Sequence, residues 1–348
     1  MKAGSRIVVI SEDLAEPWDE GIKNFAYSIG EAFKKESDVL LVNVDRSGIG
    51  SETALRIPGT KTFFNPTLRK ALREFSPDTI LYVPSPSATS SSFLRSFALR
   101  RHVPGAVVGM VGLMPRRHAR FIKPFLKRLA PHVLFVPSYK SLLFFKRLSI
   151  NAELLPVGVD RKRFRPAGSA EKTALRKRHK IDERAFVFLH VGHLSPRRNL
   201  LALSRLLEIP DSEIILVGST STYEDRQLRN HLESRGVRVI REYVLVEELY
   251  RLSDCYVFPV EDADGCVEMP LSVLEALASG LPVLTTPFGG LVDFLSEGDD
   301  VRFWRSEAEL VLSAEKVRTG HSPSVRSVNS YSWDAIADRV VAVLGGMR

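Results

Sequence analysis

The stretch CVEMPLSVLEALASGLPVLTT, residues 266–286, places a single carboxylate, Glu275, in a segment that is otherwise almost wholly apolar. Pro270 suits the first position of a helix and Gly280 suits the position just past its end, so the residues between them predict a helix that is apolar on nearly every face. Residues 282–285 then read as a short buried strand. A buried helix followed by an apolar strand is typical of a parallel sheet covered by helices on both faces.

The same alternation runs along the whole chain. The predicted strands span residues 6–10, 39–44, 79–83, 106–111 and 133–136 in the first half, and 185–191, 213–217, 237–241, 255–260 and 282–285 in the second. Helical patterns fit between them, for instance over residues 21–34 and 224–234. We therefore expect an α/β chain of two Rossmann-like, doubly wound parallel-sheet domains that face each other across a cleft.

The length of 348 residues suits two domains rather than one core. The polar stretch at residues 157–172 contains Pro and Gly and separates the two sets of strands, so we interpret it as a linker. The expected domains are residues 1–156 and 173–325.

The composition excludes several classes of protein. No apolar run approaches the roughly 20 residues that cross a bilayer, so the sequence does not predict an integral membrane protein. The two cysteines, Cys255 and Cys266, form no CxxC pair, so we expect neither a disulfide framework nor a zinc site. A cytoplasmic location is the resulting expectation.

The net charge of +8 is unevenly spread. No acidic residue occurs between Asp78 and Glu153, whereas twelve Lys and Arg residues do. Within this interval MPRRHARFIKPFLKRL, residues 114–129, interleaves basic and apolar residues as a helix lying on an anionic membrane surface would. The alternative is a solvated helix whose apolar side packs on its own sheet. No nucleic-acid recognition motif accompanies the charge, so we expect no nucleic-acid partner.

The loop VGHLSPRRN, residues 191–199, follows a predicted strand and precedes the helical pattern LLALSRLL. Arg197 and Arg198 would sit where that helix begins, beside N–H groups that have no partner within the helix. Together with Gly192 this arrangement predicts a diphosphate site, although either arginine alone could belong to an exposed basic turn.

Glu275 poses a separate problem, because an ionised carboxylate on a buried helix is costly unless positive charge or hydrogen-bond donors meet it. The vicinal diol of a ribose offers two donors in a suitable geometry, and an internal ion pair with an arginine is the alternative. The nearby TTPFGG, residues 285–290, ends a strand in paired glycines that let backbone N–H groups approach an anion. The DxD spacing in EDADG, residues 261–265, is better explained as an acidic loop than as a metal site.

Taken together, VGHLSPRRN, LLPVGVDRKRFRP and YVFPVEDADGCVEMPLSVLEALASGLPVLTTPFGG resemble the retaining, nucleotide-sugar-dependent glycosyltransferases of the GT-B fold, family 4. The closing SYSWDAIADRVVAVL is similar to the family's last helix, so the resemblance implies that residues 326–348 cross back onto the first domain. It also implies that no cofactor is needed and that no metal is bound, since the nucleotide sugar is a substrate.

The resemblance assigns a role to individual residues. Glu275 matches the glutamate that binds the donor ribose, and Arg198 matches the lysine on the donor diphosphate. Tyr243, or a neighbour in REYV, falls where the family holds the base. The family has a pair of glutamates, of which Glu275 matches the second. The position of the first is held here by Val267, and Glu268 follows one place later. The resemblance therefore implies Glu268, together with Arg198, as the catalytic residues. The implied donor-binding set is Gly192, His193, Arg197, Arg198, Tyr243, Val267, Glu268, Met269, Pro270, Leu271, Ser272 and Glu275. The implied acceptor-side set is Gly21, Lys23, Asn24, Arg116, Arg117 and His118.

The expected function is therefore transfer of a sugar from a nucleoside-diphosphate sugar to an acceptor hydroxyl. The basic first domain suggests a glycan or lipid-linked acceptor at the cytoplasmic face of a membrane, with the protein held peripherally. Two other classes stay open: a catalytically inactive GT-B binding or regulatory subunit, which the missing first glutamate suggests, and a basic polyanion-binding protein, which the charge alone suggests.

Overall fold

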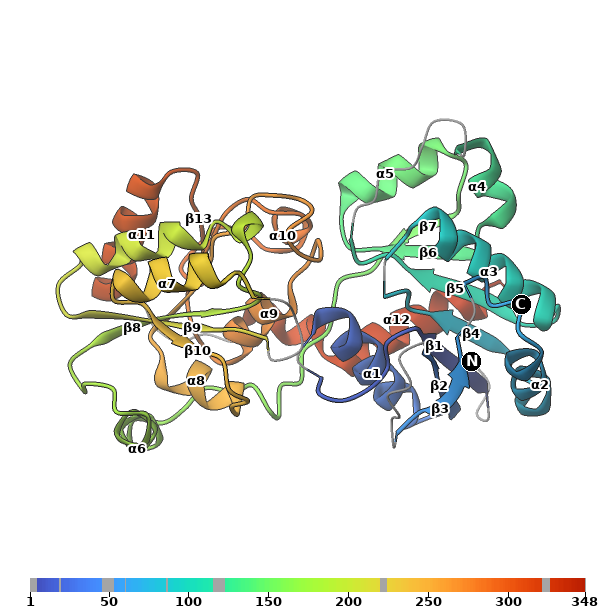
Figure 1. Ribbon diagram of the computed structural model, residues 1–348, viewed down its shortest axis with the longest axis horizontal. Helices are drawn as coiled ribbons and strands as arrows, with labels where there is room; N and C mark the ends of the chain where they lie inside the picture. Colours follow the sequence, from blue (N-terminus) through green and yellow to red (C-terminus); the bar gives the residue numbers. More distant parts are fainter. Residues whose placement is uncertain are drawn as a thin grey trace. The chain divides into compact units, whose positions relative to one another are not determined.

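The computed structural model describes residues 5–18, 20–45, 53–59, 61–85, 87–114, 123–219, 224–320 and 326–347. The chain forms two compact units, each with its own parallel sheet and flanking helices (Figure 1). Unit 1 comprises Met1–Gly158, Val267–Met269 and Trp333–Arg348, and unit 2 comprises Val159–Cys266 and Pro270–Ser332. The predicted α/β class with two doubly wound parallel sheets is confirmed.

In unit 1 the described strands form a sheet with the order β3-β2-β1-β4-β5-β6-β7. Their bounds are β1 (Arg6–Ser11), β2 (Asp38–Asp45), β3 (Leu55–Pro58), β4 (Thr79–Tyr82), β5 (Val107–Val111), β6 (Val133–Val136) and β7 (Ala152–Leu154). The helices are α1 (Gly21–Phe33), α2 (Pro66–Phe75), α3 (Ser90–His102), α4 (Lys123–Leu129), α5 (Tyr139–Arg147) and α12 (Trp333–Gly345). Strands β4, β5 and β6 are buried along their whole length, as a sheet covered on both faces requires. The strand order reverses between β1 and β4.

Helix α12 belongs to unit 1 although it lies at the end of the chain. It packs on α1, where Phe25 meets Trp333 edge to face with ring centroids 5.4 Å apart. The Lys35 ammonium lies 2.5 Å from the Asp334 carboxylate. These contacts fix the last helix of the chain against the first.

In unit 2 the described strands have the order β10-β9-β8-β11-β12-β13, again all parallel. Their bounds are β8 (Phe186–Val191), β9 (Ser212–Val217), β10 (Arg238–Ile240), β11 (Cys255–Phe258), β12 (Val283–Thr285) and β13 (Val301–Phe303). The helices are α6 (Ser169–His179), α7 (Arg226–Ser234), α8 (Val246–Leu252), α9 (Leu271–Ala278), α10 (Leu291–Phe294) and α11 (Glu307–Gly320). Three 3₁₀ segments add η1 (Pro196–Arg198), η2 (Leu200–Glu208) and η3 (Arg326–Tyr331). The order reverses between β8 and β11.

Three strands were not predicted from the sequence: β3, β7 and β13. Each has only three or four residues and contains polar residues or a proline, so none gives a continuous apolar run. The segment LLALSRLL is a 3₁₀ helix and not an α-helix. Helix α9 begins at Leu271, so Pro270 precedes the helix instead of opening it, whereas Gly280, with φ of 77°, does follow its end as predicted.

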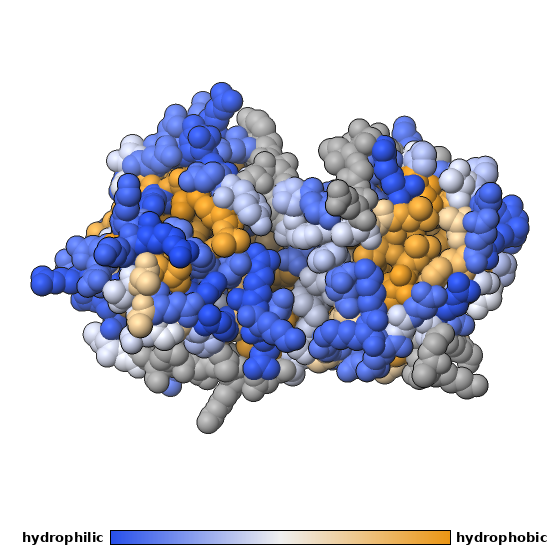
Figure 2. All heavy atoms as spheres, turned by 90° about the horizontal axis from the view of Figure 1, so that it is seen from below, coloured by the Kyte–Doolittle hydropathy of each residue, from blue (hydrophilic) through white to orange (hydrophobic). Residues whose placement is uncertain are grey.

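Within the described residues, no helix is both long enough and apolar enough to span a membrane. On the face that Figure 2 shows, hydrophilic residues border the apolar surface of each unit.

Candidate functional site

Two loops of unit 2 leave adjacent strands at the same edge of its sheet. Strands β8 and β11 pair in parallel, and the strand order reverses between them. Since parallel strands end at the same edge, the loop that begins at Gly192 and the loop that begins at Pro259 both start at the crevice where doubly wound sheets bind ligands. The residues of these loops and of helix α9, which follows the second one, make up the candidate site.

Arg198 is a buried positive charge in the first of these loops. Its side chain is buried, with Nε donating to the Gly265 carbonyl at 3.1 Å and Nη2 facing the Cys266 sulfur at 3.6 Å. A Cβ added at Gly192 would lie only 2.3 Å from Nη1, so the glycine leaves the space that this guanidinium occupies. Arg198 is therefore a cation held in one orientation by both loops, as a diphosphate site requires.

Arg197 has a different environment from Arg198. Its side chain is 59% exposed and lies 3.7 Å from the Asp264 carboxylate. The prediction placed both arginines at the start of one helix, but the left-handed residue Asn199 separates η1 from η2. Arg198 is thus the arginine that the local structure fixes in place.

His190 was not singled out from the sequence, yet it lies beside Arg198. Its ring is buried and stacked on Tyr256, and Nδ1 donates to the Val257 carbonyl at 2.8 Å, which leaves Nε2 without a proton. Burial, aided by the charge of Arg198, lowers the pKa of His190 to about 3. The ring is therefore neutral and does not repel the guanidinium. In the sequence, its place near the candidate site is indicated only by its position inside a predicted buried strand, two residues before Gly192.

Glu275 lies in the middle of helix α9, whose residues are almost all buried. Its Oε2 accepts a hydrogen bond from the Tyr250 hydroxyl at 3.1 Å. The nearby Arg163 donates to Glu247, through Nε at 3.0 Å and Nη2 at 2.9 Å, and not to Glu275. The alternative of a direct internal ion pair with an arginine is therefore not what the structure shows.

The pKa of Glu275 is raised to about 7, because burial penalises the charged form more than Arg163 and the Tyr250 hydroxyl stabilise it. The residue keeps 9% of its surface exposed, so it is not sealed from a ligand. Glu275 is only half ionised near neutral pH and has no strong hydrogen-bond donor beside it. Such a carboxylate is suited to accept hydrogen bonds from a bound molecule.

Residues 185–317 match the protein family described as Glycosyl transferases group 1. The match covers 133 of the 348 residues, so this part of the chain is similar to group 1 glycosyltransferases. The match begins one residue before β8 and ends within α11, so it contains Arg198 and Glu275.

Curated relatives of this chain are named as transferases of sugars. The chain is 27% identical, over 55% of each protein, to a GDP-mannose-dependent monoacylated alpha-(1-6)-phosphatidylinositol monomannoside mannosyltransferase of Corynebacterium glutamicum. It is 26% identical to a GDP-mannose-dependent alpha-mannosyltransferase of Mycobacterium tuberculosis, over 84% of this chain and 82% of that protein. The matched region spans about half the length of the first relative and 62% of the Arabidopsis thaliana sulfoquinovosyl transferase SQD2.

Solved structures show the fold over the whole chain. A glycosyltransferase from Rickettsia africae superimposes with a TM-score of 0.74 at 12% identity, over 99% of this chain and 98% of that one. Anabaena HepE in complex with UDP-glucose gives 0.70 at 15% identity, over 98% and 99%. The chain therefore has the GT-B fold that the sequence motifs predicted.

Glu268 lies in Val267–Met269, a segment that groups with unit 1. Its backbone N–H donates to the Leu113 carbonyl at 2.8 Å, and its Oε1 accepts from the Ser141 hydroxyl at 2.8 Å. The carboxylate is buried and engaged with α5, so contact with a sugar stays a prediction.

The other implied donor-binding residues differ in how exposed they are. Tyr243 is 67% exposed in the loop between β10 and α8, and contact with a base stays a prediction. The Ser272 carbonyl lies 3.2 Å from the Tyr250 hydroxyl, so it shares the single proton of that hydroxyl with Glu275. His193 is half-buried. The buried remainder of the set comprises Val267, Met269, Pro270 and Leu271.

The structure describes only three of the six residues predicted to lie on the acceptor side. Gly21 begins α1, the Lys23 ammonium lies 3.6 Å from the Asp13 carboxylate, and Asn24 accepts from the Ser28 hydroxyl at 2.8 Å. Lys23 is thus already neutralised by Asp13. Arg116, Arg117 and His118 lie outside the described residues.

The sequence analysis missed a polar cluster at the carboxyl edge of the unit 1 sheet. The Glu12 carboxylate, one residue past β1, accepts from the Tyr82 hydroxyl at 2.6 Å, from the Ser85 N–H at 3.0 Å and from Arg95. Because β1 and β4 flank the reversal in strand order, this cluster borders the expected ligand crevice of unit 1. The signal in the sequence was an acidic residue directly after a buried strand.

The acidic loop 261–265 behaves as an ordinary loop. The Asp262 carboxylate accepts from the Asp264 N–H at 2.9 Å, which is a turn contact. Among the residues that the structure describes, no three His, Cys, Asp or Glu side chains gather as metal ligands would.

Proposed function

We propose that the chain is a retaining glycosyltransferase that moves a sugar from a nucleoside-diphosphate sugar to an acceptor hydroxyl. The observation that carries this proposal is Glu275, a buried carboxylate with a pKa of about 7 that lacks a direct cationic partner. A ribose 2′,3′-diol would supply the two missing donors. Arg198, on the loop after the adjacent strand, would then meet the diphosphate.

The names of similar proteins support this choice of substrate. Two curated relatives are named as GDP-mannose-dependent, and HepE was solved with UDP-glucose. The shared chemistry is a nucleoside diphosphate joined to a hexose, and the base is to be determined by binding.

In the proposed reaction the bond between the anomeric carbon and the diphosphate oxygen breaks while the acceptor oxygen bonds to the same face of that carbon. Negative charge grows on the leaving phosphate, where the fixed guanidinium of Arg198 stabilises it without reorganising. The acceptor proton passes to the departing diphosphate. Trapping a covalent glycosyl-enzyme would contradict this front-face course.

Glu268 has a more limited proposed role, contact with hydroxyls of the donor sugar. That role requires its carboxylate to exchange the Ser141 hydroxyl for a sugar hydroxyl. Glu268→Gln keeps an acceptor for Ser141, so a loss of turnover in this variant with unchanged nucleotide affinity would support the role.

The acceptor is proposed to be lipid-linked or anionic and to be met at a membrane surface. Helices α4 and α5 of unit 1 expose Phe125, Tyr139 and Leu143, at 62%, 52% and 53%. The same two helices carry the basic residues Lys127, Arg128, Lys140, Lys146 and Arg147 and no acidic residue. Exposed apolar side chains among cations fit an anionic bilayer surface. We call these eight residues the α4–α5 surface.

Liposome co-sedimentation tests this surface. Wild type should pellet with anionic vesicles at low salt and not with neutral ones, and Leu143→Glu with Lys140→Glu should remain in the supernatant. The matched control is Leu312→Glu, an exposed leucine of α11 in unit 2. Equal pelleting of all three proteins would refute the surface.

Transfer itself is tested with labelled GDP-mannose and UDP-glucose and a bacterial lipid extract as acceptor. The proposal expects label in the lipid phase from one donor, with Glu275→Ala inactive. Nucleotide binding without transfer or hydrolysis of any donor would favour the inactive binding subunit instead.

A further inference from the structure

Strands β8 and β11 separate at His190. Their parallel pairing reaches Leu189 on β8 and Tyr256 on β11, and the described register between them ends there. Strand β8 itself stays paired with β9 as far as Val191. His190 therefore lies where the sheet of unit 2 opens between two strands, which is the place where the strand order reverses.

Two contacts across this opening fix the ring of His190. Its Nδ1 donates to the Val257 carbonyl on β11 at 2.8 Å. The ring also stacks on Tyr256, with the centroids 6.2 Å apart and the planes inclined by 20°. The Tyr256 hydroxyl in turn donates to the Val191 carbonyl at 3.3 Å. The ring is therefore held in one orientation, with one of its two nitrogens already engaged.

The other ring nitrogen, Nε2, shares one small space with the guanidinium of Arg198. A Cβ built on Gly192 would lie 3.1 Å from Nε2 and 2.3 Å from Nη1 of Arg198. Nε2 carries no proton, is buried and has no hydrogen-bond partner within the described residues. It is the negative end of a neutral ring, and in this buried setting it attracts the neighbouring cation. Because no ligand can reach Nε2, its effect on a ligand passes through Arg198.

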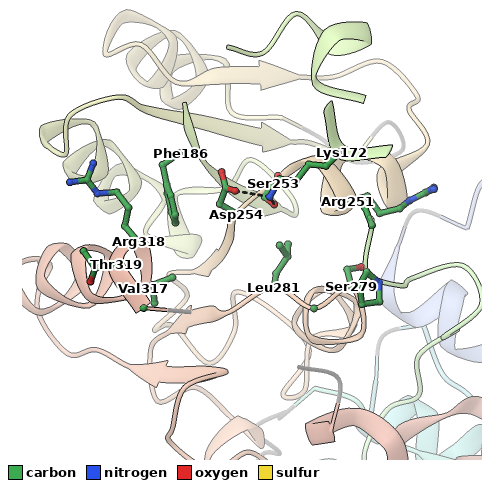
Figure 3. A pocket seen from close by; sticks show the side chains of 14 residues that line it. Lys172, Phe186, Arg251, Ser253, Asp254, Ser279, Leu281, Val317, Arg318 and Thr319 are labelled. Atoms are coloured by element: carbon green, nitrogen blue, oxygen red, sulfur yellow. Dashed lines mark hydrogen bonds and ion pairs between the residues drawn. The ribbon is translucent and has the colours of Figure 1, made fainter. Parts of the chain in front are cut away.

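Uncharged groups alone hold Arg198 within the described part of the chain. Its guanidinium contacts the Gly265 carbonyl and the Cys266 sulfur, and no described carboxylate lies within ion-pair distance of it. By contrast, the Lys172 ammonium of the same unit lies 2.6 Å from the Asp254 carboxylate (Figure 3). The charge of Lys172 is thus compensated, whereas that of Arg198 is not. Arg198 keeps 7% of its surface exposed, so this charge is not sealed from a ligand.

We propose that His190 is a positioning residue, which holds the Arg198 guanidinium through a neutral nitrogen and leaves its positive charge uncompensated for the donor diphosphate. A carboxylate in the same place would hold the guanidinium more strongly, but it would cancel the charge that a diphosphate requires. A second cation would repel the guanidinium. The inference rests on the proposed function, because it concerns the same diphosphate site.

Three substitutions separate the two ring nitrogens. An asparagine amide reaches about as far as Nδ1, so His190→Asn can still donate to Val257 but has no atom in the place of Nε2. A glutamine amide reaches about as far as Nε2, so His190→Gln restores an uncharged acceptor beside Arg198. His190→Phe keeps a ring that stacks on Tyr256, lacks both nitrogens and serves in place of His190→Asn should that variant not fold.

The matched control is His102→Asn. His102 is a buried histidine of unit 1 whose Nε2 hydrogen-bonds to the Phe63 carbonyl at 2.8 Å, so its replacement shows the effect of removing a buried ring as such. Urea unfolding of every variant reports whether the fold is kept.

Calorimetry compares binding of UDP and GDP with that of uridine and guanosine, which lack the phosphates. We expect His190→Asn and His190→Phe to weaken diphosphate binding about tenfold without weakening nucleoside binding. His190→Gln should stay within about threefold of wild type, and His102→Asn should bind as wild type does. In an Arg198→Ala background, His190→Asn should have no further effect, since its influence passes through the guanidinium.

A second measurement needs no nucleotide. NMR of protein labelled with ¹⁵N-arginine follows rotation of the guanidinium groups, and Arg198→Lys assigns the signal of Arg198. Rotation should be faster in His190→Asn and His190→Phe than in wild type and His190→Gln.

Two results would overturn the inference. One is a rotation rate of Arg198 that is the same in wild type, His190→Asn and His190→Phe. The other is a loss of diphosphate affinity that is equally large with and without Arg198, because the effect would then not pass through the guanidinium. If wild type binds no nucleoside diphosphate, the proposed function fails, and the rotation rate still decides whether His190 holds Arg198.

Discussion

Nucleotide affinity should depend on the ionisation of Glu275. A ribose diol donates two hydrogen bonds to the carboxylate, so the ligand should prefer the ionised form. With a pKa of about 7, about one Glu275 in eleven is ionised at pH 6 and about ten in eleven are ionised at pH 8. The dissociation constant of the nucleotide should therefore be about tenfold lower at pH 8 than at pH 6.

The same group should also affect stability, with a definite sign. Below pH 4.5 Glu275 is protonated in both the folded and the unfolded chain, so its burial costs little. Between pH 4.5 and 7 the unfolded chain loses this proton and the folded chain keeps it, so the free energy of unfolding falls as the pH rises. The difference between the two pKa values corresponds to at most about 3 kcal/mol above pH 7.

Calorimetric titrations with UDP and GDP from pH 6 to 8, on wild type and on Glu275→Gln, check the reasoning. The glutamine is neutral and keeps an oxygen for the Tyr250 hydroxyl, while titration of the nucleotide phosphate is common to both proteins. Glu275→Gln should bind weakly with little pH dependence and should be more stable than wild type at pH 8. The reasoning is refuted if both proteins show the same pH dependence.

Three further predictions concern the rest of the chain. Arg198→Ala should reduce kcat by about 10²–10³ with the fold intact, whereas Arg197→Ala should reduce it less than about tenfold, as steady-state kinetics would show. Asp254→Asn leaves the buried Arg176 without its carboxylate and should lower the free energy of unfolding in urea by about 3 kcal/mol, and an unchanged midpoint would contradict the ion pair. Turnover should survive EDTA; a loss that magnesium or manganese restores would show that a metal takes part.

The fold was predictable where burial dictates the sequence. Strands such as β4, β5 and β6 are buried on both faces, so their runs of Val, Ile and Leu stand out. The edge strands β3, β7 and β13 are too short for any periodicity to show. The 3₁₀ form of η2 was not predictable, because apolar spacing does not distinguish two tight helices.

The candidate site was predictable only at the level of single residues. The unusual charge of Glu275 in an apolar helix was visible in the sequence, and its burial is as expected. The partners of Glu275 and Arg198 were not visible, since Tyr250 lies 25 positions from the first and Gly265 lies 67 positions from the second. Contacts of this kind arise only when the sheet brings its loops together. The neutral state of His190 beside Arg198 was not predictable for the same reason, because it depends on a hydrogen bond to Val257 on another strand.

The central claim is that unit 2 binds a nucleoside diphosphate through Glu275. A thermal-shift panel of UDP, GDP, ADP and CMP, with and without magnesium, on wild type and Glu275→Ala tests it most directly. A nucleotide at 100 times its dissociation constant adds about 2.7 kcal/mol to the free energy of unfolding, which the assay resolves. The account predicts that one nucleotide stabilises wild type independently of magnesium and stabilises the variant much less. Stabilisation by none of the four, or equal stabilisation of both proteins, would contradict it.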